Sequence, residues 1–161
     1  MESDVRRLLV EHEISRTLLR YCRGVDGMDE ALVRSAFHPD ASIRMGGFDG
    51  GVDEFVAFLW KVISRRTMTM HYLTNTSVGF GPAGADVESY GIAVQGGVGT
   101  PPKGNVLTGF RHLDRFTERD GRWLVTERTA RTEWNRADHL SGPWSLPDGV
   151  QPSIRHQEGA R

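Results

Sequence analysis

The sequence has little cysteine: Cys22 is the one cysteine among 161 residues. A single cysteine cannot form an internal disulfide, and no Cys/His cluster has the repeated short spacing of a structural zinc site. We therefore expect a fold that is held together by a hydrophobic core, without disulfides or a structural metal.

An excess of charge of one sign is also missing, because 20 Lys and Arg residues balance 21 Asp and Glu residues. A net charge of -1 gives no basic field for nucleic acid or an anionic membrane surface, so neither is expected as a partner. The longest apolar stretch, residues 52–63, contains three charged residues, and residues 1–7 lead into no signal-peptide core. We expect a cytoplasmic protein.

The length and the content of 38% hydrophobic residues suffice for one domain with one core. Apolar residues at helical spacing predict a first helix over residues 3–23, with Gly24 as its stop. A second helix is expected over residues 29–37, before Pro39, and a third over residues 53–64. The chain therefore begins with three helices.

Strand patterns dominate the rest of the sequence. Strands are expected over residues 41–45, 68–80, 86–95, 106–118 and 122–134, and Asp120-Gly121 is a strong hairpin signal. We expect residues 46–51 to form a loop and residues 96–104 a loop that could serve as a lid. Helices followed by a meander of antiparallel strands predict an α+β domain over residues 1–134, with the sheet curled around the helices. Residues 135–161 form a Pro/Gly-rich tail, which either packs on the domain or is partly disordered.

Alternation along two strands predicts a pocket wall. On one strand, His71 shares a face with Thr69, Leu73 and Asn75. On the last strand, one face mixes apolar side chains with a single arginine. That face carries Leu124, Thr126, Arg128, Ala130, Thr132 and Trp134.

Spacing alone does not link the polar residues of these segments into a site. A lone strand histidine such as His71 is more often structural than catalytic. Asp26 has the sequence context of a helix cap or a turn, Arg128 that of an ion-pair residue, and Tyr21 that of a core residue.

Four motifs together resemble a known family. They are RYCRGVD at residues 20–26, FHPDA at residues 37–41, MHYLTN at residues 70–75, and GRW at residues 121–123 followed by Arg128. The chain from about residue 3 to 134 resembles a SnoaL-like domain of the nuclear-transport-factor-2-like superfamily. It is most similar in motif to the bile-acid dehydratase, scytalone dehydratase and hexachlorocyclohexane dehydrochlorinase group. The resemblance implies a cone-shaped, cystatin-like α+β barrel with a cavity between the sheet and the first helix.

The resemblance also implies a chemistry. His71 matches the family's histidine base and Asp26 the aspartate that orients it, while Arg128 and Tyr21 match residues of the same cavity. The implied reaction is a cofactor-independent, metal-independent elimination of the dehydratase type, with Tyr21 favouring an oxygen leaving group over a halide. The expected substrate is a hydrophobic ring compound such as a steroid, terpenoid or polyketide. Its expected pocket residues are Met70, Leu73, Phe110, Leu124, Thr132 and Trp134.

Two alternatives remain open at this point. One is an isomerase or cyclase that uses the same Asp-His pair, and the other is a non-catalytic module for ligand binding or assembly, because fold alone does not decide function. A homodimer or homotrimer is expected, since exposed apolar residues on the outer face of the sheet would suit either assembly.

Overall fold

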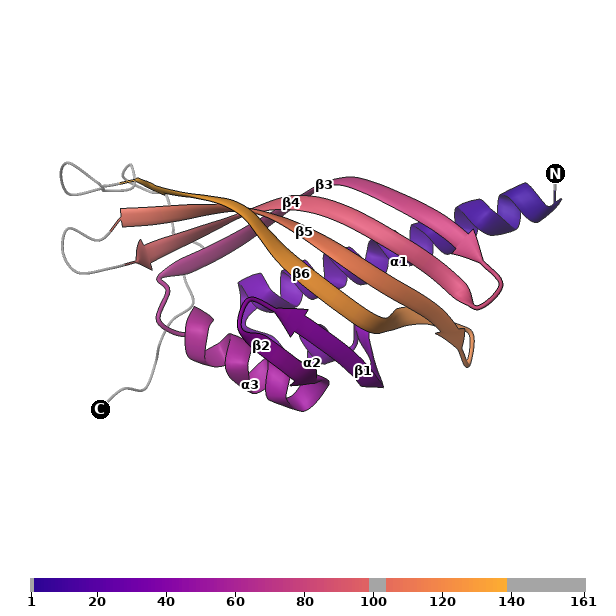
Figure 1. The fold of residues 1–161 in the computed structure, drawn as a ribbon, viewed down its shortest axis with the longest axis horizontal. Helices are drawn as coiled ribbons and strands as arrows, with labels where there is room; N and C mark the ends of the chain where they lie inside the picture. Colours follow the sequence, from indigo (N-terminus) through magenta and orange to yellow (C-terminus); the bar gives the residue numbers. More distant parts are fainter. Residues whose placement is uncertain (1, 99–103, 139–161) are drawn as a thin grey trace, which may run out of the picture.

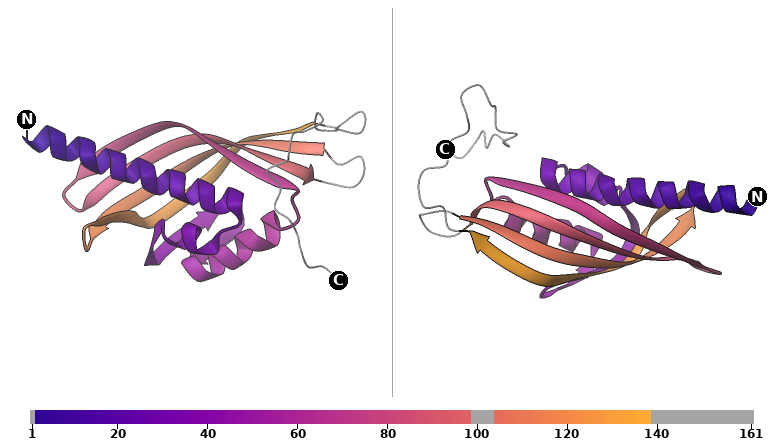
Figure 2. Two further views of the ribbon diagram at one scale, coloured as in Figure 1. Left: turned by 180° about the vertical axis from the view of Figure 1, so that it is seen from behind. Right: turned by 90° about the horizontal axis from the view of Figure 1, so that it is seen from above.

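A computed structural model describes residues 2–98 and 104–138 of the chain. Three helices precede the long strands: α1 (Glu2–Gly27), α2 (Glu30–Arg34) and α3 (Val52–Ile63). Asp29 caps α2 by accepting a hydrogen bond from the Leu32 amide, at 2.9 Å. The helices cover one face of the sheet, and α1 runs along the strands (Figures 1 and 2). Within this part of the chain, every helix is too short or too polar to span a bilayer.

Six strands form one curved, open sheet in the order β2-β1-β6-β5-β4-β3 (Figure 1). Their bounds are β1 (Phe37–Met45), β2 (Phe48–Gly51), β3 (Met68–Gly81), β4 (Gly84–Val98), β5 (Gly104–Arg119) and β6 (Arg122–Asp138). The expected α+β class is confirmed. The expected lid falls largely on residues 99–103, and most of the expected tail falls on residues 139–161, so both lie outside the described residues. The last strand extends four residues into the segment that was assigned to the tail.

The first two strands differ from the sequence-based expectation. Helix α2 ends at Arg34, and the chain enters β1 at Phe37 instead of continuing as a helix. β1 pairs in parallel with β6, and the Val125 amide donates to the Ala36 carbonyl at 3.1 Å. The glycine-rich segment expected as a loop contains β2, which pairs antiparallel with β1. Non-local pairing of this kind leaves little trace in a local pattern.

Helix α1 is longer than its pattern predicts, and its first turns extend past the sheet (Figure 2). Val5, Leu8 and Leu9, which fit the predicted apolar stripe, are therefore exposed. The core contacts of α1 come from its second half, where Ile14, Leu18, Tyr21, Cys22 and Val25 are buried.

Irregular pairing in the long strands changes which residues face the helices. The register between β3 and β4 shifts between Leu73 and Thr76, so Asn75 is exposed while Val78 packs on the core. The register between β5 and β6 shifts at Thr126, so Trp123 and Val125 pack on the core instead of Leu124. A bulge of this kind places an extra residue in one strand and thereby breaks the period-two pattern.

Candidate functional site

Asp26 lies in the last turn of α1, in a position that the helix ending dictates. Met28 has a left-handed backbone with φ 56°, and the Asp29 amide donates to the Gly24 carbonyl at 2.9 Å. This is a helix-ending motif of the Schellman type, in which Met28 takes the place predicted for Gly24, four residues later. Gly24 instead allows α1 to pack closely against α2, because a Cβ at this position would lie 2.7 Å from the Val33 backbone nitrogen.

A carboxylate in the last turn faces the negative end of the helix dipole, which disfavours it by a few tenths of a kcal/mol to about 1 kcal/mol. Two hydrogen bonds from β3 offset this cost for Asp26. The His71 amide donates to one carboxylate oxygen at 2.9 Å, and His71 Nδ1 lies 2.6 Å from the other. Asp26 thus contacts both the backbone and the ring of one residue.

This two-point contact fixes the His71 ring. With the Asp26 carboxylate at Nδ1, the neutral imidazole carries its proton on Nδ1 and leaves Nε2 as the atom with a free lone pair. The side chains of His71 and Asp26 are 12% and 27% exposed, so the pair is partly accessible to solvent. The arrangement is that of a base oriented by a carboxylate.

Phe110 of β5 lies between two histidine rings of the site, those of His71 and His112. Its ring lies edge-on to the His71 ring, with centroids 5.8 Å apart, and tilted against the His112 ring at 4.6 Å. Gly91 of β4 pairs with Phe110, and a Cβ at Gly91 would lie 2.3 Å from the phenylalanine ring. The glycine therefore makes room for the aromatic ring beside the dyad.

Arg128 is buried in a two-point ion pair with Asp114 of β5. Its Nε and Nη2 donate to the two carboxylate oxygens, each at 2.7 Å. Burial lowers the pKa of Arg128, but the adjacent Asp114 carboxylate outweighs that effect, so the pKa lies above its usual value. The guanidinium carbon also lies 4.4 Å from the centre of the Tyr21 ring. Arg128 is therefore a permanent, fixed cation.

Tyr21 is enclosed between Arg128 and two other rings. Its ring stands edge-on to Phe37 and to His112, at 5.8 Å and 5.9 Å. Burial raises the pKa of Tyr21 to about 12, against the opposing effect of the Arg128 charge. The phenol can donate a hydrogen bond but is a weak proton donor at neutral pH. Burial likewise raises the pKa of Cys22 to about 11, so its thiol is not a ready nucleophile.

Two members of this cluster, His112 and Asp114, belong to none of the sequence motifs. Both alternate on β5 with half-buried residues and lie between the buried Phe110 and Phe116. Burial lowers the pKa of His112 well below its usual value of 6.5, and the charges of Arg128 and His71 lower it further. Polar residues at inward positions of an alternating strand were the available signal.

Other residues expected in the pocket are divided between the two faces of the sheet. Leu73 packs against the core, and Thr132 pairs with Phe110 at an exposed position. Met70 is exposed and points away from His71, as alternation requires. Trp134 is exposed over Gly109 because the register shifts again between Gly109 and Phe110.

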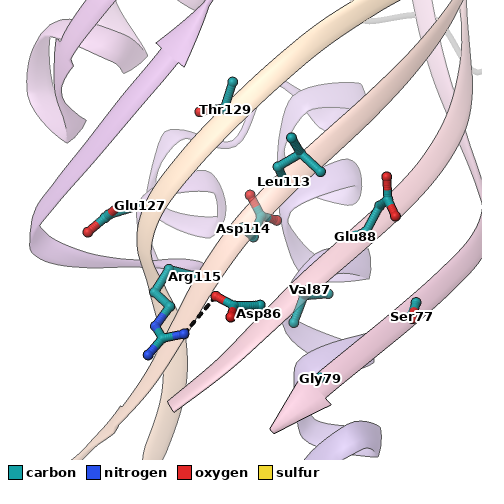
Figure 3. Close-up of a pocket in the computed structure, with 10 residues that line it drawn as sticks. All are labelled: Ser77, Gly79, Asp86, Val87, Glu88, Leu113, Asp114, Arg115, Glu127 and Thr129. Atoms are coloured by element: carbon teal, nitrogen blue, oxygen red, sulfur yellow. Dashed lines mark hydrogen bonds and ion pairs between the residues drawn. The ribbon is translucent and has the colours of Figure 1, made fainter. Parts of the chain in front are cut away.

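A shallow groove of about 500 Å³ lies on the opposite face of the sheet from the helices (Figure 3). Exposed or half-buried charged side chains dominate it, including Asp86, Glu88, Glu127 and Arg115, and Arg115 pairs with Asp86 at 2.7 Å. Asp26, His71 and Tyr21 do not line it. The groove is therefore separate from the Asp26–His71 site. Among residues 2–98 and 104–138, no three His, Cys, Asp or Glu side chains are grouped in a way that could hold a metal ion.

The fold and the site together define a class: a small α+β domain with a curved sheet, in which a carboxylate of the first helix orients a strand histidine and the sheet holds a buried arginine. Residues 6–129 match the sequence model of the SnoaL-like domain. The chain belongs to this family. No curated protein matches the sequence.

Solved structures agree on the fold. A scytalone dehydratase-like protein from Novosphingobium aromaticivorans DSM 12444 superposes with a TM-score of 0.73 at 20% identity, covering 90% of this chain and 97% of that one. A type 2 hexachlorocyclohexane dehydrochlorinase (LinA) gives 0.77 at 20% identity, covering 91% and 99%. A cystatin-like protein of unknown function from Nostoc punctiforme PCC 73102 gives 0.60 at 18% identity, covering 78% and 92%. The chain thus shares its fold with a dehydrochlorinase and with a dehydratase-like protein.

Proposed function

We propose that this protein is a cofactor-independent lyase of the dehydratase type, which acts on a hydrophobic cyclic small molecule. The observation that carries the proposal is the double contact of Asp26 with His71, which leaves Nε2 of a partly exposed histidine as the base. Similarity of fold to a dehydratase-like protein and a dehydrochlorinase supports an elimination, although fold alone does not define a reaction.

In the proposed reaction, His71 Nε2 removes a proton from carbon, and the electron pair of that C–H bond becomes the new C=C bond. The adjacent C–O bond breaks, and the leaving hydroxyl takes the proton from the His71 imidazolium to depart as water. Asp26 stabilises the imidazolium between the two steps, since a carboxylate at Nδ1 favours the charged ring. The base is regenerated, and the substrate loses one molecule of water.

The activity is tested on a panel of hydroxylated steroids, terpenoids and polyketides, with loss of water followed by mass spectrometry. His71→Ala is expected to lower the rate by roughly two to four powers of ten, the usual contribution of a positioned proton-transfer group. Asp26→Asn is expected to lose almost as much, because the amide no longer holds the correct tautomer. His12→Ala on the exposed face of α1 and Asp49→Asn in the β1–β2 hairpin serve as matched controls.

Three outcomes contradict the proposal. Full turnover by His71→Ala would show that His71 is not the base. A product of unchanged mass that has taken up deuterium from D2O would indicate an isomerase with the same dyad. Binding of panel compounds without any conversion would indicate a non-catalytic binding module.

A further inference from the structure

Three arginines lie where the start of β6 packs on the middle of α1: Arg16 and Arg20 of the helix and Arg122 of the strand. The Thr17 hydroxyl donates to the Trp123 carbonyl at 3.2 Å. Arg16 and Arg122 directly precede these two residues in the chain, so both lie next to the same contact. Nη2 of Arg20 donates to Thr17 Oγ1 at 3.0 Å, which brings its guanidinium there as well. These three residues are called the arginine cluster.

The arginine cluster has more positive than negative charge. None of its guanidiniums forms an ion pair with another described residue. By contrast, Arg119, which pairs with Arg122 across the β5–β6 hairpin, is neutralised by Asp40 at 2.7 Å. The Glu13 carboxylate is nearby and accepts a hydrogen bond from the Trp123 amide at 3.0 Å. Against this one carboxylate, the cluster keeps two positive charges in excess.

Arg20 experiences the repulsion of the other two guanidiniums. Burial lowers the pKa of Arg20 first, and the charges of Arg122 and Arg16 lower it further, against the opposing effect of Glu13. Like charges at positions i and i+4, as at Arg16 and Arg20, also destabilise a helix. An anion between the guanidiniums would offset both effects.

Arg20 also keeps a hydrogen-bond donor that has no acceptor. Its Nη2 serves Thr17 and the Ser35 carbonyl, the latter at 3.2 Å, whereas its Nε is buried and has no partner among the described residues. In Arg128, the same two atoms together hold the Asp114 carboxylate, each at 2.7 Å. Buried donors are almost always paired, so the matching edge of Arg20 indicates a place for the oxygen of an anion.

We propose that Arg16, Arg20 and Arg122 bind the phosphate group of a small-molecule phosphate monoester. Such a group carries a charge of about −1.5 to −2 at neutral pH, which matches the excess charge of the arginine cluster. Planar guanidiniums also bind phosphate oxygens through pairs of parallel hydrogen bonds. Arg16 and Arg122 are exposed and Arg20 is half-buried, so the ligand reaches the cluster from solvent.

This phosphate site is separate from the Asp26–His71 pair. Arg16 lies ten residues before Asp26 on α1, which is about 15 Å along the helix axis. The inference therefore adds a second site and does not depend on the proposed elimination. Its test measures binding at equilibrium, so the result is independent of turnover.

The test compares phenyl phosphate, a dianion at neutral pH, with phenyl sulfate, a monoanion of the same shape, by protein-observed NMR titration of the full chain. The wild type is expected to bind the phosphate roughly tenfold more tightly, with shift changes at the Thr17 and Trp123 amides. Arg16→Gln and Arg122→Gln, at exposed positions, are each expected to reduce this preference to about threefold or less, because the remaining excess charge matches a monoanion. Arg65→Gln, an equal loss of charge at an exposed position after α3, keeps the full preference.

The inference is overturned if the two esters bind equally, if neither binds, or if Arg65→Gln lowers the preference as much as Arg16→Gln. Vesicles of phosphatidylcholine with phosphatidic acid present the same monoester on a lipid, and the wild type is expected not to sediment with them. Sedimentation that Arg122→Gln abolishes would assign the phosphate to a membrane and overturn the small-molecule ligand.

Discussion

Asp114 and Arg128 form a fully buried ion pair, and their side chains are 0% and 1% exposed. Removing one partner of a buried pair leaves an unpaired charge, which costs about 3–5 kcal/mol. Asp114→Ala is therefore expected to lower the free energy of unfolding by that amount in urea. The double variant Asp114→Leu with Arg128→Met is expected to recover much of the loss, since an apolar pair carries no buried charge.

The control for this prediction is the surface pair of Asp86 and Arg115, in which Asp86 keeps 77% of its exposure. Exposed ion pairs contribute about 0–1 kcal/mol, so Asp86→Ala is expected to change little. Equal, small effects of Asp114→Ala and Asp86→Ala would show that Asp114 does not hold a buried cation.

Because His112 is buried, we expect the free energy of unfolding to depend on pH. Burial first, and then the charges of Arg128 and His71, place the pKa of this histidine well below 6.5 in the folded protein. Between that lowered pKa and 6.5, the unfolded chain binds more protons at this position than the folded one, so stability rises with pH. We therefore expect the free energy of unfolding to fall as the pH is lowered from 7 to 5, by up to about 1.4 kcal/mol per pH unit from this group.

The measurement is urea unfolding at a series of pH values for the wild type and His112→Gln, which cannot titrate. The slope between pH 7 and pH 5 is expected to be smaller in His112→Gln. His12→Gln, at an exposed position on α1, is expected to keep the wild-type slope. Parallel curves for the wild type and His112→Gln would contradict the prediction.

At the scale of elements, the pairing of β4 with β5 depends on a glycine. A Cβ at Gly91 would lie 2.3 Å from Cζ of Phe110 and 2.8 Å from the Tyr72 carbonyl oxygen. Gly91→Ala is therefore expected to cost about 1–3 kcal/mol of stability and to displace the Phe110 ring from His71. Gly79→Ala, whose nearest contact would be an ordinary 3.8 Å, is the control.

The measurement for Gly91 is a double-mutant cycle with Phe110→Ala. If the Phe110 ring is the obstacle, Gly91→Ala destabilises the Phe110→Ala variant less than it destabilises the wild type. Part of the destabilisation remains, because the new Cβ still meets the Tyr72 carbonyl oxygen. A Gly91→Ala variant as stable as Gly79→Ala would mean that the strands adjust without moving the ring.

Elements with strong local patterns were predictable, and those defined by distant pairing were not. The three helices and the four long strands follow from periodicity and from turn residues such as Asp120 and Gly121. The sequence predicted β1 only over residues 41–45 and assigned β2 to a loop, because β1 is completed by β6, whose paired residues lie 85 to 88 positions away in the chain. The class of the fold did not depend on these two strands.

The candidate site was predictable where a motif marked it. Asp26 and His71 were named from the resemblance, and their contact is a property of the structure that sequence spacing could not give. Bulges at Thr126 and near Gly109 changed the facing of Leu124 and Trp134, since one extra residue reverses the alternation. Asp114 and His112 belong to no motif, so their burial became visible only in three dimensions.

At the scale of the whole molecule, the outer face of the sheet carries an apolar row in continuous register. Tyr72, Ile92, Gly109 and Trp134 pair in turn across β3, β4, β5 and β6, and the Trp134 ring covers Gly109. Tyr72 and Trp134 are exposed, as is Met70 in the next row. We expect this apolar row across four strands to be an interaction surface.

The neighbouring charges favour a second copy of this chain as the occupant of that surface. Arg111 already pairs with Glu88 and Glu133, at 3.0 Å and 2.7 Å, so the rim of the row presents charges that are paired within the chain. A partner of opposite charge would find no unpaired group among these residues, whereas an identical apolar row matches the surface. We therefore expect a homodimer or homotrimer that packs through this face.

The prediction is checked by light scattering at micromolar concentration. The wild type is expected to have twice or three times the mass of the chain, and the double variant Tyr72→Glu with Trp134→Glu is expected to be mostly monomeric, because two carboxylates would be buried without partners. Leu8→Glu, at an exposed apolar position on the part of α1 that extends past the sheet, separates this effect from a general loss of exposed hydrophobic surface. A monomeric wild type would contradict the assembly, and dissociation by Leu8→Glu alone would place the interface on α1 instead of the sheet.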